Sequence, residues 1–339
     1  MNARTLACWL LCGLVLGACG GKQDEVVVQT AGTELGESDI DRDPLALLPG
    51  GFVGLVYVDA KKTVASPFGQ KLVSLAQAQL PVPASAGVEP SRDIDRAWIG
   101  FYSMQGIDVA AVVSGRFDRT KIEKAAAAQE KTPLGGPVVV STYAGRKLYT
   151  VQNLGFSLLT QRTALLGNET GMRRALDRMK EGRVKRQIPS WLRSMLETPN
   201  APMVIGVDLR ANPVPDAARQ QLPFLNGLET ARVLGNFEPP GLNFAGTLSY
   251  PDEQAAQKGA ASVTQIAQNL DSYGWILALL QIEQPVRKLQ ARAEGKDTQF
   301  VLGVDGEGIS RLLDRLQQFL GTPQNRGPVD ATTSPAVKP

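Results

Sequence analysis

The side chains that most often carry catalysis are scarce in this sequence. It contains no histidine, and its three cysteines, Cys8, Cys12 and Cys19, all lie at the start of a chain of 339 residues. Without imidazole, catalytic triads and proton relays that use histidine are excluded. Beyond Cys19 there is no thiol for a disulfide, a nucleophile or a thiolate metal site. We therefore predict no catalytic residue, no metal and no cofactor in the body of the protein.

Cys19 itself stands where a covalent modification is expected. Arg4 provides a short positive region, and residues 6–16 are mostly apolar but too few to cross a bilayer comfortably. An aliphatic residue and two small ones then precede the cysteine, in the order Leu16-Gly17-Ala18-Cys19. This segment resembles the lipobox of bacterial lipoproteins.

The resemblance implies a location in the cell and a membrane anchor. Cleavage would fall between Ala18 and Cys19, so that residues 1–18 are a signal peptide and Cys19 becomes the first, lipid-carrying residue. Two or more acyl chains hold a protein stably on a membrane where one does not. Gly20 rather than aspartate follows the cysteine, which resembles the outer-membrane address of enterobacterial lipoproteins. The resemblance thus implies an outer-membrane lipoprotein that faces the periplasm.

The rest of the chain divides by composition and by an internal similarity. Residues 19–44 are polar and glycine-rich, which predicts a flexible tether, and residues 321–339 predict a disordered tail. The segment 171–179 resembles the segment 308–316, and 94–97 resembles 228–231, in the same order and at nearly the same offset, and further upstream 56–59 resembles 205–208. We therefore predict two tandem similar domains from a duplication, residues 45–182 and 201–320, joined by a basic connector at residues 183–200.

Hydrophobic periodicity gives both halves a similar series of elements. In the first half we expect strands at 52–58, 97–102, 109–113 and 138–141, with helices that begin at Pro67 and at Thr120. In the second we expect strands at 203–207, 231–237, 242–250 and 299–304, with helices at 217–221 and 252–269. This order, β-α-β-β-α-β, is that of the ferredoxin-like unit, here with a closing helix. The predicted class is α+β, with extra strands at 147–151, 156–160 and 164–166 and an apolar helical stretch at 275–289.

One segment is strongly basic and is the main candidate for binding an anion. Eight cations stand in it against two acids, Asp177 and Glu181. They are Arg173, Arg174, Arg178, Lys180, Arg183, Lys185, Arg186 and Arg193. Such a cluster could face an acidic protein or the phosphates of an anionic lipid. The alternative is a solvated helix face followed by a connector.

Three further patterns favour structural interpretations. Residues 304–308 combine glycines with two carboxylates before a helix, which indicates a turn capped by Asp305 rather than a phosphate site. Residues 38–43 space three carboxylates like a calcium loop but lack its glycine and its final glutamate. Asp93 and Asp95 precede a strand, where an exposed position is commoner than an acid/base pair.

The sequence favours a non-catalytic binding or scaffold protein, attached to the membrane through Cys19. Its partners would be an envelope protein or an anionic lipid, and nucleic acid is not expected at that address. A lipid-handling protein is the first alternative, with a tunnel lined by residues 275–289. A hydrolase that uses paired carboxylates is the second.

Overall fold

The computed structural model describes residues 35–103, 108–182, 184–198, 201–239, 241–272 and 286–321. The predicted signal peptide, Cys19 and the greater part of the predicted tail therefore lie outside the described residues. So does most of the apolar stretch predicted as a helix at 275–289. No helix in the described part of the chain is long and apolar enough to span a bilayer.

The first half of the chain supplies seven strands and several short helices. The strands are β1 (Gly54–Asp59), β2 (Ile94–Phe101), β3 (Val109–Gly115), β4 (Val139–Tyr143), β5 (Arg146–Val151), β6 (Leu154–Leu158) and β7 (Thr163–Gly167). The helices are α2 (Glu37–Arg42), η1 (Pro44–Leu47), α3 (Ala60–Val64), α4 (Gly69–Ala78), η2 (Ala84–Ala86), α5 (Pro90–Asp93), α6 (Arg119–Ala127) and α7 (Glu169–Lys180).

The second half repeats much of this order. Its strands are β8 (Met203–Asp208), β9 (Thr230–Asn236), β10 (Gly241–Ser249), β11 (Val286–Glu294) and β12 (Asp297–Asp305). Its helices are α8 (Ser190–Leu196), α9 (Asp216–Gln221), η3 (Pro223–Leu225), α10 (Glu253–Ser272) and α12 (Gly306–Gly321). The mixed α and β class predicted from periodicity is confirmed.

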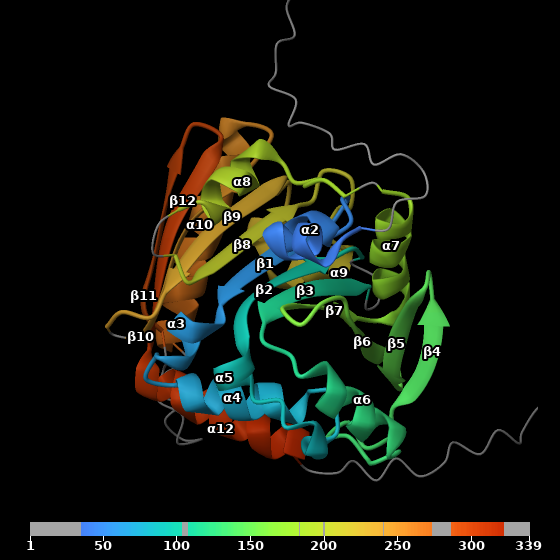
Figure 1. Cartoon of the computed structure of the whole chain (residues 1–339). Coiled ribbons are helices and arrows are strands. Elements are labelled where there is room, and N and C mark those ends of the chain that lie inside the picture. Colours follow the sequence, from blue (N-terminus) through green and yellow to red (C-terminus); the bar gives the residue numbers. More distant parts are fainter. Residues whose placement is uncertain are drawn as a thin grey trace, which may run out of the picture.

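All the described strands join one twelve-stranded sheet (Figure 1). Its order is β11-β12-β10-β9-β8-β1-β2-β3-β7-β6-β5-β4. The first strands of the two halves, β1 and β8, lie side by side at its centre, and Gly54 is opposite Val207. From this pair each half extends outward in its own direction, so that the two halves share a sheet instead of facing each other across a cleft.

The predicted ferredoxin-like topology is wrong. That topology would place the first strand of each half in parallel beside the third. Instead β1 pairs with β2 in antiparallel register, with Asp59 opposite Arg96, and β8 pairs with β9 in the same way. Because β1 and β2 are antiparallel neighbours, the helices that connect them lie at one end of the two strands. They do not pack across a face of the sheet, as the helix of a ferredoxin-like unit would.

Helices cover the two faces unevenly. On one face, α7, η1 and α8 pack on the first half and on the central seam, where Leu55, Val112 and Leu165 are buried. On the other face, α6 and η2 cover β3, β7, β6 and β5, and α10 covers β9, β10 and β12. Helices α4 and α12 lie together at one end of the sheet (Figure 1), around the buried ring of Phe68.

Three segments differ from the sequence prediction. Residues 35–44 were expected in the tether, but Glu37–Arg42 forms α2, because Asp41 accepts hydrogen bonds from Thr160 (2.6 Å) and Thr163 (2.7 Å). The predicted connector contains α8, whose Leu192 is fully buried. Residues 286–289, predicted as helical, belong to strand β11.

Gly171 tests how closely α7 approaches the sheet. A Cβ atom at this position would lie 2.2 Å from the carbonyl oxygen of Val109 in β3. We expect Gly171→Ala to lower the free energy of unfolding by about 1–3 kcal/mol, because backbone on both sides must shift. Gly136→Ala is the control, since its Cβ would meet only a methyl group of Val151 at 3.7 Å. Urea denaturation measures both, and equal effects would contradict this account of the packing.

Candidate functional site

The strands β9, β10, β12 and β11 have one face that α10 covers and one face that the described part of the chain leaves open. Ala231, Leu248 and Phe300 point to the covered face and pack with α10. Since side chains alternate along a strand, their sequence neighbours point to the opposite face. A groove of about 950 Å³ lies on that opposite face and continues into a second hollow of about 480 Å³. Volumes of this size are typical of ligand sites.

The register of the four strands arranges the open face in rows that cross the sheet. One row has a cation at each end, and in the order of the strands β11, β12, β10 and β9 it reads Arg292, Gln299, Thr247 and Arg232. The next row is less polar and reads Gln290, Val301, Ala245 and Leu234. The third row reads Lys288, Gly303, Asn243 and Asn236. The face is therefore an apolar strip between two polar rows.

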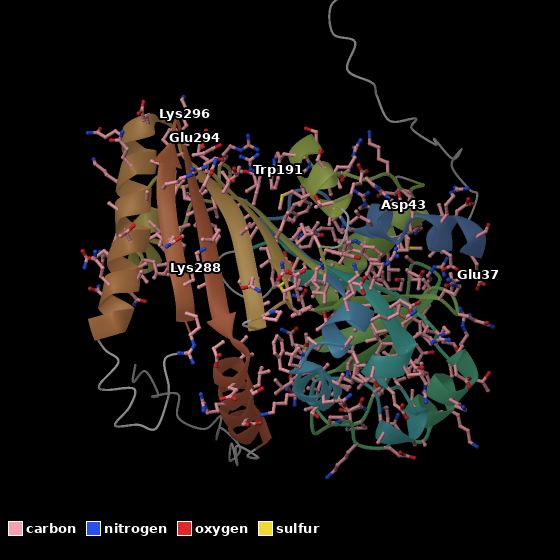
Figure 2. The ribbon with its side chains drawn as sticks, turned by 90° about the vertical axis from the view of Figure 1, so that its left-hand side faces the viewer. Glu37, Asp43, Trp191, Lys288, Glu294 and Lys296 are labelled. Atoms are coloured by element: carbon pink, nitrogen blue, oxygen red, sulfur yellow. The ribbon has the colours of Figure 1, made fainter. Side chains whose placement is uncertain are left out.

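Small side chains make the centre of this face hollow. Ala245 and Gly303 provide no bulk above the middle strands, β10 and β12. On one side the wall is Met195 of α8, and on the other it is Lys288 of β11. Figure 2 shows this side of the molecule, with Trp191 of α8 on one side and Lys288 and Glu294 of β11 on the other.

The guanidinium of Arg292 is held over the groove by polar neighbours. It donates to Oε1 of Gln299 at 2.8 and 3.1 Å, and Gln299 donates in turn to Glu294 at 2.7 Å. The direct ion pair between Arg292 and Glu294 is long, at 3.7 Å, and both side chains are well exposed. Exposed pairs of this kind contribute little, so Arg292 keeps donors for an additional acceptor.

Arg232 and Lys288 complete the positive charge of the groove. Arg232 contacts Ser249 at 3.3 Å and Asp297 at 3.5 Å, and its Nε–H is buried without a hydrogen-bond partner among the described residues. Within the described part of the chain, Lys288 makes no ion pair. Two neighbouring strands lie about 4.8 Å apart, so Arg232 and Arg292, three strands apart, are separated by about 14 Å.

The basic segment predicted to bind anions does not form one surface. Arg178 is 5% exposed and donates to Gln187, to the carbonyl oxygen of Lys185 (2.9 Å) and to that of Ala46 (3.2 Å). It therefore joins α7 to η1 and to the segment before α8. Its role is to hold the fold together, and it is not available to a partner.

Three of the other cations of this segment have acidic or aromatic partners. Arg173 pairs with Glu169 at 2.5 Å and lies over the ring of Tyr143. Arg174 pairs with Asp108 at 2.9 Å, and Arg186 pairs with Asp43 at 2.9 Å. Three more have other surroundings: Lys180 and Lys185 are exposed, and Arg193 is half-buried on α8. Arg183 lies outside the described residues.

Tyr143 and Asp177 form a further contact in this region. The tyrosine hydroxyl donates to both carboxylate oxygens of Asp177, at 2.9 and 3.0 Å. This hydrogen bond raises the pKa of Tyr143, and desolvation adds to the shift. The contact ties strand β4 to α7, and it assigns a structural task to the aspartate of the segment 171–179, which resembles 308–316.

The three minor patterns have structural roles. Asp305 accepts a hydrogen bond from the Gly308 amide at 3.0 Å, which lowers the pKa of the aspartate and caps α12 as predicted. Asp93 is bound by Arg92 at 2.7 Å, which lowers its pKa, whereas Asp95 pairs with Lys61 at 2.7 Å. The described residues bring no three metal-ligating side chains together.

The open groove was missed at the level of sequence. Its signal is the alternation of polar and apolar residues over 288–294. The apolar helical stretch predicted at 275–289 ended inside this segment, which concealed that alternation. The sequence of one strand does not indicate which small side chains its neighbours place beside it, because that depends on the register.

The role of Arg178 can be tested by removing its charge. We expect Arg178→Met to lower the free energy of unfolding by about 2–4 kcal/mol, because the carbonyl groups of Ala46 and Lys185 lose their donor. Arg173→Met on the same helix should cost less than about 1 kcal/mol, since its pair with Glu169 is exposed. Urea denaturation of the two variants decides, and a mild effect at Arg178 would show that the contact is dispensable.

Comparison with protein-family models and with curated proteins finds no match. Among solved structures, crystal form I of TP0453 is similar, with a TM-score of 0.49 and 11% identity over 81% of this chain and 97% of that one. Crystal form III has a TM-score of 0.48 and 11% identity over 80% of this chain and 98% of that one. At this level of similarity nothing follows about ligands or activity.

Proposed function

We propose that this chain is a lipid-anchored, non-catalytic protein of the cell envelope that binds a partner on the open face of β9, β10, β12 and β11. The anchor would be acylated Cys19 after cleavage of residues 1–18, with the body on the periplasmic side of the outer membrane. The observation that supports binding is the groove of about 950 Å³ on the face of β9, β10, β12 and β11 that lies opposite α10.

The chemistry of the groove indicates the kind of partner. Arg232, Arg292 and Lys288 surround it, and no carboxylate is among the described residues that line it. The central strip of Leu234, Ala245 and Val301 offers apolar surface between the cations. A partner with acidic groups on both sides of a small apolar part would satisfy both features. We therefore favour an acidic segment of another envelope protein.

An anionic lipid is the second candidate. The same cations suit phosphate groups, and the apolar strip suits the first carbons of an acyl chain. The tunnel expected for a lipid carrier involves residues 275–285, which lie outside the described residues. Native mass spectrometry of the protein extracted from membranes would distinguish a bound lipid from a bound polypeptide.

The hydrolase alternative has less support. Paired carboxylates about 5–10 Å apart across a cleft would be needed, and the lining of the described groove does not provide them. Glu294 and Asp297 lie beyond the lining at one end, where they engage Arg292 and Arg232. We therefore place binding ahead of hydrolysis.

We further propose that the two halves arose by duplication, as the sequence similarity predicts. Matching positions cap matching helices in both halves. The amide of Gly171 donates to Asn168 at 3.1 Å, and that of Gly308 donates to Asp305 at 3.0 Å. Asp118 likewise caps α6 and Asp252 caps α10. Equivalent hydrogen bonds at equivalent places support common descent of the halves.

The anchor is tested at Cys19. We expect Cys19→Ser to abolish incorporation of labelled fatty acid and removal of residues 1–18, because the thiol is the acylation point. Cys12→Ser, within the apolar region, should change neither. Metabolic labelling, gel mobility and membrane fractionation measure the outcome. Full labelling of the Cys19→Ser variant would remove the lipoprotein assignment.

The binding face is tested by filling the groove. A photo-crosslinking residue at Gln290 in the full-length, membrane-attached protein should capture a partner, identified by mass spectrometry. Adding Ala245→Trp should reduce that capture by about tenfold or more, since the indole occupies the hollow. Ala261→Trp, at an exposed position on the opposite side of α10, is the matched control. Equal capture in both tryptophan variants, or none at Gln290, would contradict the proposed site.

A further inference from the structure

The two edge strands of the sheet differ in how they are protected. An edge strand offers unpaired backbone groups, and proteins commonly block it with charged residues or bulges. Strand β11 has both: its sequence includes Arg287, Lys288 and Arg292, and its register shifts between Val286 and Lys288. Strand β4, with the sequence Val-Val-Ser-Thr-Tyr, contains no charged residue, and its register with β5 is regular.

The hairpin geometry identifies which backbone groups of β4 are free. The turn between β4 and β5 consists of Ala144 and Gly145, both with positive φ (49° and 76°), as a type I′ turn requires. In such a hairpin Tyr143 and Arg146 exchange hydrogen bonds, and every second residue of β4 then does the same. The N–H and C=O groups of Val140 and Thr142 consequently point away from β5.

The side chains of this edge are apolar and exposed. Of the large apolar side chains that the structure describes, four are exposed, and two of them are Val139 (61%) and Val140 (46%). Adjacent residues of a strand point to opposite faces, so one valine is exposed on each side of the sheet. An added strand would cover both valines and satisfy the outward backbone groups.

We propose that a second copy of this chain adds its own β4 to this edge, antiparallel and about a two-fold axis at Ser141. Val140 and Thr142 then exchange backbone hydrogen bonds with Thr142 and Val140 of the second copy. Val139 lies opposite Tyr143 of the second copy. Pairs of β-branched and aromatic residues stabilise antiparallel strands, and the uncharged strand brings no like charges together.

A strand from another protein could satisfy the same backbone groups, but self-pairing fits the side chains. The sequence 139–143 is complementary to its own reverse, with serine opposite serine at the centre. Two-fold pairing also closes the assembly, because both β4 edges are then covered and only the charged β11 edges remain. Five residues bury much less than the roughly 1,200 Å² of a stable interface, and the dimer should therefore dissociate on dilution.

Disulfide trapping tests the axis directly. In Ser141→Cys, the two cysteines occupy a non-hydrogen-bonded pair, with Cα atoms about 4.5 Å apart, within disulfide range. Oxidation of the full-length, membrane-attached variant should give a product of twice the protein mass. The wild-type chain controls for Cys8, Cys12 and Cys19, and Ser194→Cys, at an exposed position on α8, controls for random collision.

A second substitution distinguishes strand pairing from mere proximity. Adding Val140→Lys to Ser141→Cys should reduce the trapped dimer about tenfold, because it puts a charge on the edge. If Val140→Lys lowers the melting temperature of the protein, Val139→Lys is used in its place. Equal trapping at residues 141 and 194, no dimer at residue 141, or a disulfide to a different protein would overturn the proposal.

Discussion

The antiparallel pairing of β1 with β8 is the constraint on which the rest of the architecture depends. It joins strands that are far apart in sequence, with Leu55 opposite Gly206 and Val56 opposite Ile205. At Gly206 a Cβ atom would lie 2.6 Å from a methyl group of Leu192. The missing side chain therefore lets α8 lie directly on the seam, and α8 supplies Met195 to the wall of the groove. Gly206 in the central strand pair thus allows the position of α8, and α8 in turn forms one wall of the groove.

The groove is open because the two halves use their closing helices differently. In the first half α7 packs on the sheet through Met172, Leu176 and Met179. Its counterpart α12 instead packs against α4, where Ile309 and Leu313 contact Phe68 and Lys71 binds Asp314 at 2.6 Å. The face of the second half that corresponds to the α7-covered face consequently keeps its polar rows exposed. The two halves therefore differ in where their closing helices pack.

The positions of the strands and helix caps were largely predictable from the sequence, whereas the arrangement of the strands in the sheet was not. Strand positions and the caps at Asp118 and Asp305 follow from periodicity and from side chains that accept nearby amides. The ferredoxin-like order failed because the same series of elements also fits strands that pair with their sequence neighbours. The basic segment failed because counting charges cannot show that Arg178 is buried against carbonyl groups. The groove depends on register across four strands, which no single segment encodes.

The positions of the two proposed surfaces make them compatible. The groove lies at the end of the sheet formed by β11, and the unprotected edge is β4 at the opposite end. With about 4.8 Å between neighbouring strands, these ends are about 50 Å apart along the sheet. Between them, Leu35 and Ile40 are buried in the core next to α7, so a tether from the proposed anchor would join the body between the two ends. A dimer formed through β4 would therefore leave both grooves free and far apart, and one assembly could engage two partners.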